Sequence, residues 1–359
     1  MKLLLITGSL GTGGLERISC FVANYFIKKG WDVDILALFE KEDGSKKVFN
    51  YLEKKVKIHY FTGNFDPLNN KKKAIFPWIK LIKNTINLVK PDSILCMTFK
   101  IGSLAAIAAP RYREKITVRE INDPKASGRS QFSNKITELF CRKIKSVIFQ
   151  TQWEQSCYGA TIRKKGAVIP NPITINCDKV GTYQHNTFFT MSRLLIKQKR
   201  QDVLIQAFKK AHDLDNTLFL EIYGSGPDKD ILDKIINDLN CNAFIKICKP
   251  IPNIHDTIIN HRGFIITSDY EGMSNALLEA YCLGIPCISS DWPGVNDIIT
   301  HNLDGMIYKR QDVEELVRYI LLIAHSHEKC SEITSNAIKN KVKFETENIM
   351  EQYFSIITK

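Results

Sequence analysis

The sequence contains no uninterrupted apolar run of the roughly 18 residues that a transmembrane helix needs. The apolar stretch near its start, residues 3–6, is shorter than the core of a secretory signal peptide and leads directly into glycines. The ten cysteines include no Cys-x-x-Cys pair and no spacing typical of zinc ligands. Most of them lie in apolar strings, where a reduced cysteine packs as a small hydrophobic residue. These absences predict a cytoplasmic chain without a membrane span or disulfides.

Internal repeats and low-complexity tracts are also missing, which excludes solenoids and arrays. What is present is the composition of a soluble globular enzyme, with 44% hydrophobic and 25% charged residues. A length of 359 residues exceeds what one core usually serves, so we expect two domains.

The net charge of +12 is unevenly distributed along the chain. Residues 1–180 carry a net charge of +16, whereas residues 181–359 carry −4. A basic half indicates an anionic partner, which the charge alone leaves open between nucleic acid, acidic lipid and a phosphorylated ligand. An ordinary solvated basic surface explains the count equally well.

Short apolar runs alternate with longer segments of helical period, which is typical of βαβ units and a parallel sheet. We expect strands at residues 2–7, 33–39, 93–97, 145–150, 188–192, 218–223, 264–268 and 286–290, with helices after residue 14 and at 201–211, 228–239 and 275–283. Two prolines in residues 169–172 disfavour both helix and central strand. We therefore expect a boundary there between two Rossmann-like domains, with a ligand cleft lined by the carboxyl ends of both sheets.

Three groups of residues are candidates for the chemistry. A glycine-rich turn, residues 8–14, opens the first helix, where backbone amides attract anions; a plain tight turn explains it equally well. Arg193 and Lys199 follow the first strand of the second half and suit a diphosphate, although a solvated charge run has the same spacing. Glu271 and Glu279 flank a helix start, and a carboxylate at position 279 in an apolar segment needs a partner or a ligand hydroxyl.

The segment from Glu271 to Ala280 closely resembles the signature of glycosyltransferase family 4, in which two glutamates are separated by seven residues. The resemblance extends over nearly the whole second half, in matching order: residues 169–172, 192–194 with Lys199, 223–227, 284–288 and 304–307. In the first half it is confined to residues 13–17 and the general βα pattern.

The resemblance implies a GT-B architecture of two Rossmann-like domains whose parallel sheets face each other across a cleft. Residues 1–170 would bind the acceptor and residues 171–340 the nucleotide sugar, while a last helix, residues 341–359, packs back on the first domain. It also implies transfer of a hexose or N-acetylhexosamine from a nucleotide sugar, with retention of configuration and without a metal or other cofactor. We expect the nucleotide of this donor to be UDP. The acceptor would be a growing, lipid-linked glycan in the synthesis of a bacterial surface polysaccharide such as capsule, O-antigen or lipopolysaccharide.

The same resemblance assigns roles to residues. Glu271 would hold hydroxyls of the donor sugar, Glu279 the ribose hydroxyls, and Arg193 with Lys199 the diphosphate charge. The nucleobase would lie near residues 249–251. The catalytic set is thus Glu271, Arg193 and Lys199, and the nucleotide-sugar set comprises Gly14, Arg193, Lys199, Ile251, Glu271, Gly272, Met273, Ser274, Asn275 and Glu279.

One feature departs from the family. Many relatives carry a histidine after a middle strand of the first domain, but residues 96–100 and 117–123 contain none. Glu120 and Asp123 are weak candidates for assisting the acceptor hydroxyl, and proton uptake by the departing phosphate needs no protein base. No Asp-x-Asp metal motif stands out in a plausible loop.

Residues 71–83 mix lysines with Phe76 and Trp78, as basic amphipathic segments at anionic lipid surfaces do. A packed helix with a solvated lysine face has the same pattern. The membrane hypothesis places the protein at the inner face of the plasma membrane, through Lys71, Lys72 and Lys73, with Phe76 and Trp78 as an apolar anchor. It suits a lipid-diphosphate acceptor.

Other function classes stay open beside the glycosyltransferase. A nucleotide-sugar epimerase shares the architecture, and a dinucleotide-dependent oxidoreductase would use the first glycine turn but leaves the paired glutamates unexplained. A nucleic-acid-binding protein is disfavoured because no recognised binding motif accompanies the basic half.

Overall fold

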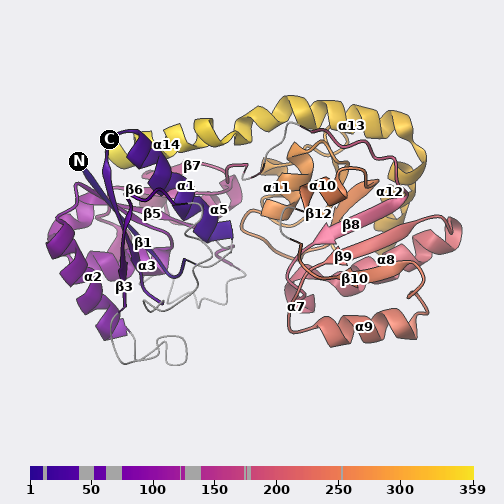
Figure 1. Cartoon of the computed structure of the whole chain (residues 1–359), viewed down its shortest axis with the longest axis horizontal. Helices are drawn as coiled ribbons and strands as arrows, with labels where there is room; N and C mark the ends of the chain where they lie inside the picture. The colour runs from indigo at the N-terminus through magenta and orange to yellow at the C-terminus, as the bar shows by residue number, and fades with distance from the viewer. Residues whose placement is uncertain are drawn as a thin grey trace. The chain divides into compact units, whose positions relative to one another are not determined.

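The protein is described by a computed structural model of the whole chain, in which residues 1–10, 14–39, 52–61, 75–121, 123–125, 139–173, 175, 179–251 and 254–359 are placed. Its internal contacts divide it into two compact units, Met1–Pro172 with Thr346–Lys359, and Ile173–Glu345 (Figure 1). The expected boundary at residue 170 falls beside this division, and the last helix belongs to the first unit.

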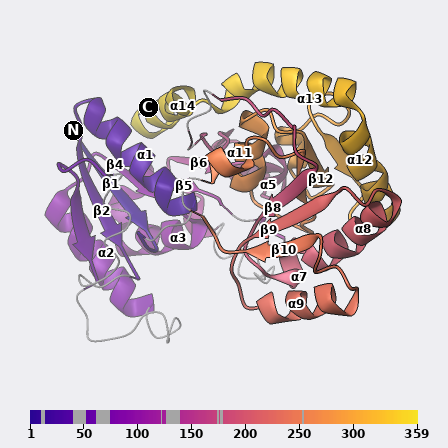
Figure 2. The same ribbon diagram turned by 45° about the vertical axis from the view of Figure 1, so that its right-hand side comes forward.

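The first unit is a parallel sheet of seven strands in the order β3-β2-β1-β4-β5-β6-β7, flanked by helices (Figure 2). This order, with the first strand at the centre, is that of a Rossmann domain. Its elements are β1 (Lys2–Thr7), α1 (Gly14–Lys28), β2 (Asp32–Ala37), β3 (Lys57–Tyr60), α2 (Ile75–Val89), β4 (Ser93–Cys96), α3 (Phe99–Ala108), the 3₁₀ helix Pro110–Lys115, β5 (Ile116–Arg119), β6 (Ser146–Phe149), α5 (Gln152–Ser156), α6 (Ala160–Arg163), β7 (Gly166–Val168) and α14 (Thr346–Thr358).

The second unit repeats the plan with six parallel strands in the order β10-β9-β8-β11-β12-β13. Its elements are β8 (Thr187–Met191), α7 (Ile196–Lys199), α8 (Gln201–Leu214), β9 (Phe219–Tyr223), α9 (Lys229–Asp238), β10 (Ile245–Cys248), α10 (His255–Ile258), β11 (Gly263–Ile266), α11 (Asn275–Cys282), β12 (Cys287–Ser290), the 3₁₀ helices Val295–Asp297 and Lys341–Phe344, β13 (Met306–Tyr308), α12 (Val313–His325) and α13 (His327–Asn340). The prediction of two parallel-sheet α/β domains is confirmed.

Both sheets are covered on two faces, which explains why their strands are continuous apolar runs rather than alternating ones. In β1, Leu4 and Ile6 join the core beneath α2 and α3, whereas Leu3 and Leu5 join the core beneath α1 and α14. In β8, the neighbouring Phe188 and Phe189 likewise enter opposite cores. Every strand pair is parallel, so all loops that follow strands of one sheet gather at one edge.

Helix α14 is held on the first unit by aromatic and polar contacts. The ring of Phe354 lies 5.0 Å from that of Phe26 in α1. The hydroxyl of Tyr353 accepts a hydrogen bond of 2.5 Å from Nε of Arg119, which is fully buried at the end of β5. Among the residues that are placed, no helix is both long and apolar enough to cross a bilayer.

Candidate functional site

The site of the second unit lies where the strand order reverses. Strand β8 is flanked by β9 on one side and by β11 on the other, so the chain leaves β8 and β11 in opposite directions. In open α/β sheets the carboxyl edge at such a point is where ligands bind. Arg193 stands two residues beyond β8 and Glu271 five residues beyond β11, so both predicted residues reach this edge.

The loop after β8 is shaped by close contact with the turn after β9. The amide of Ser192 donates to the carbonyl of Tyr223 and that of Leu194 to Ser225, both at 3.0 Å. A Cβ atom at Gly224 would lie 2.0 Å from the carbonyl oxygen of Ser192, and one at Gly226 would lie 2.2 Å from that of Leu194. Only glycine permits this approach, so these two positions fix the path of the loop that carries Arg193.

Lys199 and Glu271 form a buried ion pair at this edge. Nζ of Lys199 lies 2.5 Å from Oε1 of Glu271, and their side chains are 16% and 9% exposed. The hydroxyl of Ser268 donates to the same oxygen at 2.6 Å. The hydroxyl of Thr267, just after β11, donates to the carbonyl of Lys199 at 2.7 Å, which ties the end of α7 to that strand.

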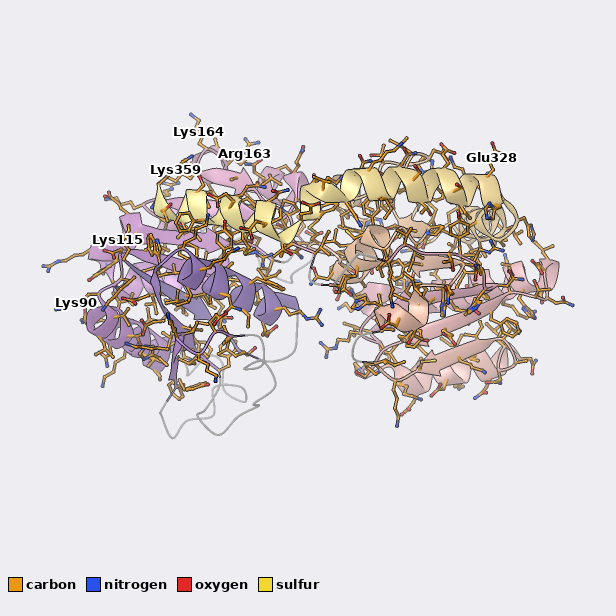
Figure 3. The ribbon with its side chains drawn as sticks, turned by 45° about the horizontal axis from the view of Figure 1, so that its top comes forward. Lys90, Lys115, Arg163, Lys164, Glu328 and Lys359 are labelled. Atoms are coloured by element: carbon orange, nitrogen blue, oxygen red, sulfur yellow. The ribbon has the colours of Figure 1, made fainter. Side chains whose placement is uncertain are left out.

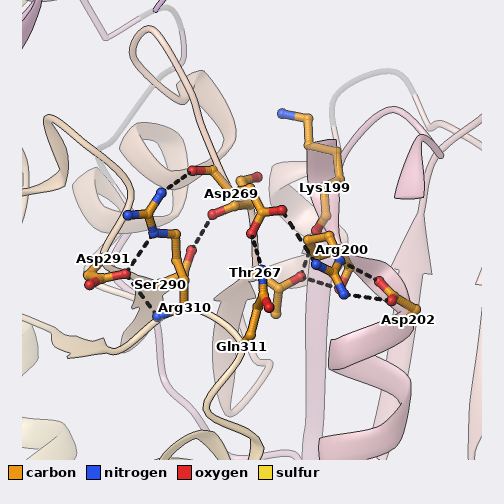
Figure 4. A network of polar contacts seen from close by, with 10 residues as sticks. Lys199, Arg200, Asp202, Thr267, Asp269, Ser290, Asp291, Arg310 and Gln311 are labelled. Carbon is orange, nitrogen blue, oxygen red and sulfur yellow. Dashed lines mark hydrogen bonds and ion pairs between the residues drawn. The ribbon is translucent and has the colours of Figure 1, made fainter. Parts of the chain in front are cut away.

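Two nearby arginines, Arg200 and Arg310, form hydrogen bonds and ion pairs with aspartates (Figure 4). Arg200 ends α7 at a φ of 50° and bonds Asp202 through Nε at 3.0 Å and Nη2 at 2.9 Å. This double hydrogen bond raises the pKa of Arg200 against the opposing effect of its partial burial. Arg310 donates to the carboxylate of Asp291 at 3.0 Å and to the backbone oxygen of Asp269 at 2.8 Å.

Lys199 extends away from both arginine networks. Arg193 is exposed, and among the placed residues its side chain has no hydrogen-bonding or ionic partner. Arg193 and Lys199, the two cations that the sequence assigns to a diphosphate, both lie at this edge, where Arg193 is exposed and Lys199 pairs with Glu271.

Helix α11 begins at Asn275, four residues after Glu271, and carries Glu279 in its second turn. Its cap is Ser274, whose Oγ accepts from the amide of Leu277 at 3.3 Å. Met273 is buried in the core, while Gly272 and Asn275 are partly exposed. The side chain of Glu279 is only 14% exposed, and its Oε2 lies 3.6 Å from Nε2 of His255 in α10.

Comparison with known proteins identifies the class. Residues 175–340 match the family described as "Glycosyl transferases group 1". The chain is 21% identical over 351 residues, 96% of its length and 96% of the relative's, to an uncharacterized glycosyltransferase of Haemophilus influenzae. The chain superimposes on the crystal structure of HepE from Anabaena in complex with UDP with a TM-score of 0.81 and 18% sequence identity. The match covers 100% of both chains. The chain is a GT-B glycosyltransferase.

A further relative matches mainly over one half. The UDP-Gal:alpha-D-GlcNAc-diphosphoundecaprenol alpha-1,3-galactosyltransferase of Escherichia coli is 27% identical over 174 residues, which is 46% of this chain and 43% of that protein. The resemblance to a glycosyltransferase family and its GT-B fold, both expected from the sequence, are thus confirmed.

Two further predicted ligand residues of the glycosyltransferase belong to other elements. Ile251 follows β10 and is 44% exposed. Gly14 begins α1 in the first unit, and its predicted neighbours Gly11 and Gly13 lie outside the placed residues.

The candidate acceptor-side carboxylates of the glycosyltransferase are engaged internally. Glu120 is fully buried and accepts hydrogen bonds from the hydroxyl of Tyr158 and the amide of Ile121. Asp123 accepts from the amide of Lys125 at 2.8 Å. Both side chains therefore shape the edge of the first sheet in this structure.

The expectation that Trp78 anchors a membrane-binding segment is wrong. Trp78 is 1% exposed, and its Nε1 donates to the carbonyl of Leu38 at 3.1 Å. Phe76, on the other side of α2, is 83% exposed. Lys71, Lys72 and Lys73 lie outside the placed residues.

Sequence reasoning missed several residues that build the site. Ser268 and Thr267 orient Glu271 and Lys199, and a hydroxyl three residues before a site glutamate is a signal that was available. Asp202 and Asp269 occupy Arg200, and His255 faces Glu279. The pairs Arg200–Asp269 and His255–Glu279 carry no local signal because tertiary packing creates them.

Proposed function

We propose that this glycosyltransferase moves a hexose or N-acetylhexosamine from a UDP-sugar to a growing, lipid-linked glycan of a bacterial cell surface, with retention of configuration. The observation that carries the donor assignment is the Lys199–Glu271 pair beside the exposed Arg193, at the reversal point of the second sheet. HepE is a GT-B structure that binds UDP, and the Escherichia coli relative is named for a UDP-sugar and a diphosphoundecaprenol acceptor.

In this mechanism the bond between the sugar's anomeric carbon and the diphosphate breaks, and negative charge grows on the departing phosphate. Arg193 and Lys199 offset that charge, and the amides of Gly272, Met273, Ser274 and Asn275 assist at the start of α11. Fixed cations do the work that a metal ion does in other transferases. Among the placed residues there is no group of three or more metal-binding side chains.

Glu271 binds hydroxyls of the donor sugar, and a carboxylate there also stabilises positive charge at the anomeric carbon electrostatically. Glu279 accepts hydrogen bonds from the ribose hydroxyls. Gly14 is a further residue assigned to the donor, and the nucleobase lies near Ile251.

The acceptor hydroxyl attacks the anomeric carbon and passes its proton to an oxygen of the departing diphosphate. This route needs no protein base. The internal hydrogen bonds of Glu120 and Asp123 support it, because both carboxylates already have partners.

The first unit meets the anionic membrane surface that presents the acceptor, so the enzyme is cytoplasmic and peripheral, without a nucleic-acid partner. The net charge of +16 in residues 1–180 supports this arrangement. Lys90, Lys115, Arg163 and Lys164 stand exposed on that unit (Figure 3).

The test is release of nucleoside diphosphate from a panel of UDP-, GDP- and ADP-sugars, with and without lipid-diphosphate-linked acceptors. We expect rapid release from a UDP-sugar only when acceptor is present, with product of unchanged anomeric configuration. Conversion of the sugar nucleotide without any acceptor would instead indicate an epimerase.

Arg193→Ala and Lys199→Ala should each lower turnover by about 10²–10³, the effect of losing one charge-stabilising group. Lys197→Ala is the matched control, since Lys197 is an exposed lysine of the same helix α7. EDTA should change the rate little. Strict dependence on Mg²⁺ or Mn²⁺ would show that a metal carries the charge assigned to these two residues.

A further inference from the structure

Helix α10 shares an apolar core with α11. Ile254, which precedes α10, and Ile258 within it are buried in the same core cluster as Leu278. Leu278 is the residue before Glu279 in α11. Movement of α10 would open that core, so the side chain of His255 has a defined position relative to Glu279.

Nε2 of His255 is buried and makes no hydrogen bond with any placed residue. A buried polar nitrogen without a partner is unfavourable, so native structures rarely keep one without a reason. The nearest carboxylate oxygen, Oε2 of Glu279, lies 3.6 Å away, which is beyond ordinary hydrogen-bond length. The two groups face each other closely enough to interact electrostatically and to tighten into a hydrogen bond.

The other charged group of α10 has a different partner. Asp256 pairs with Lys179 at 2.5 Å, and both side chains are largely exposed. This pair binds the outer face of α10 to the segment before β8 and leaves His255 as the polar group turned toward α11.

We infer that His255 is a positioning residue for Glu279: it holds one carboxylate oxygen so that the carboxylate is oriented for the two ribose hydroxyls of the donor. The inference rests on the proposed function, which assigns the ribose to Glu279. A carboxylate has about four acceptor positions, so one oxygen can accept from an imidazole N–H while hydroxyls donate to the rest. Donor binding then draws Nε2 and Oε2 into hydrogen-bond distance and gives the nitrogen its partner.

The competing interpretation is that the pair only joins α10 to α11. The two interpretations differ in one observable. A residue that orients Glu279 matters only for nucleotides that carry ribose hydroxyls, whereas a residue that merely supports the fold affects all nucleotides alike.

The experiment is calorimetric titration of the full chain with UDP, GDP and ADP, followed by the 2′-deoxy and 2′,3′-dideoxy forms of whichever binds most tightly. Glu279→Gln should weaken binding of the parent nucleotide by about 10-fold or more, the scale of hydrogen bonds to a charged group. His255→Ala should weaken it by about 5–10-fold. Neither variant should change binding of the dideoxy nucleotide, and adding His255→Ala to Glu279→Gln should cause little further loss.

His255→Gln keeps a hydrogen-bond donor of similar size and should recover part of the affinity, which also covers the case in which His255→Ala folds poorly. The matched control is His325→Ala. His325 pairs with Asp215 at 2.9 Å, near the amino end of β9 and so at the opposite edge of the sheet. This variant should bind every nucleotide as the parent does.

Equal weakening of ribo- and dideoxynucleotide by His255→Ala would overturn the inference, because the residue would then act through the fold. Unchanged affinity in His255→Ala, with a clear loss in Glu279→Gln, would overturn it while leaving the proposed function intact. If Glu279→Gln bound all the nucleotides as the parent does, the ribose assignment itself would have failed, and the role of His255 with it.

Discussion

The buried ion pair between Lys199 and Glu271 gives a sharp prediction about stability. The side chain of Glu271 is only 9% exposed, and its identified side-chain donors are Lys199 and the hydroxyl of Ser268. In Lys199→Met, Ser268 is the one of these two donors that is left. Breaking a buried pair in this way costs about 3–5 kcal/mol, and the retained hydroxyl favours the lower end, about 3 kcal/mol. For a unit the size of Ile173–Glu345, that lowers the melting temperature by about 6–12 °C.

Glu271→Gln should cost less, about 1–2 kcal/mol, because the longer lysine side chain can turn toward solvent. The double variant Lys199→Met/Glu271→Gln leaves no buried charge, and removing both partners of a buried pair is often nearly neutral. We therefore expect the double variant to be more stable than Lys199→Met alone. Because the single losses sum to about 4–5 kcal/mol and the double loss is at most about 1 kcal/mol, the coupling is about 3–5 kcal/mol.

The assay is urea unfolding followed by hydrogen exchange and mass spectrometry, with peptides from β8 and β11 as reporters of the second unit. The control cycle is Lys229→Met with Asp233→Asn in α9, a pair of the same 2.5 Å length whose side chains are 53% and 41% exposed. Exposed helix pairs couple by about 0.3–0.5 kcal/mol. Equal coupling in the two cycles, or additive losses at Lys199 and Glu271, would refute the argument that burial makes this pair strong.

Three further predictions concern other parts of the molecule. Gly226→Ala should lower turnover by about 10²-fold in the donor panel assay, since its Cβ would displace the loop that carries Arg193, whereas Ser225→Ala, at the exposed neighbour, should not. Burial raises the pKa of Glu154 from its ordinary 4.5 to about 8, so its contribution to stability is greatest below pH 4.5 and is lost as the pH rises toward 8. In Glu154→Gln, stability should therefore fall less between pH 5 and pH 8 than it does in the parent, as measured by the urea midpoints at the two pH values. The protein should float with vesicles that contain phosphatidylglycerol at low salt, and Phe76→Ser should weaken this flotation. Changing Lys71, Lys72 and Lys73 together to Glu should abolish flotation and leave the affinity for UDP unchanged. If the triple variant floats as the parent does, this segment does not contact the membrane.

The sequence predicts those strands whose apolar runs are five residues or more. β1, β8 and β9 all appear within a residue or two of their expected positions. The four-residue strands β4, β6, β11 and β12 are expected as well, because each lies in a longer apolar run. Two strands that are not expected are β5, Ile116–Arg119, which ends in an arginine, and β13, Met306–Tyr308, which has three residues. Their apolar runs are too short to show a period, and pairing with a neighbouring strand makes them extended.

In helix α2, the spacing of the apolar residues predicts which side chains are buried better than the residue types do. Trp78 is in phase with Ile82 and Ile86, at intervals of four residues, and all three are buried. Phe76 lies off that face and is exposed. Grouping Trp78 with the lysines because of its residue type hid a core position that the helical spacing indicates.

In the candidate site, residues close in sequence are predicted together, whereas residues far apart in sequence are not. Glu271, Ser274 and Glu279 lie within one loop and one helix, so their spacing alone places them together. The partners Lys199 and Glu271 are 72 residues apart, and they meet because β8 and β11 are neighbours in the sheet. Sequence order gives each residue's distance from a strand end but not which strand ends adjoin.

The net negative charge of the second half does not decide whether its site can bind an anion. Residues 181–359 carry a net charge of −4, yet the acidic side chains near the site neutralise the cations that build it. Asp202 and Asp269 hold Arg200, and Asp291 holds Arg310, so both arginines serve as structural ties between loops. Lys199 pairs with the carboxylate of Glu271, whereas Arg193, which follows β8 at the same edge, is exposed. Because an ion pair cancels most of its own field a few ångströms away, the potential that a ligand meets at this edge is set chiefly by the exposed Arg193 rather than by the net charge of the unit.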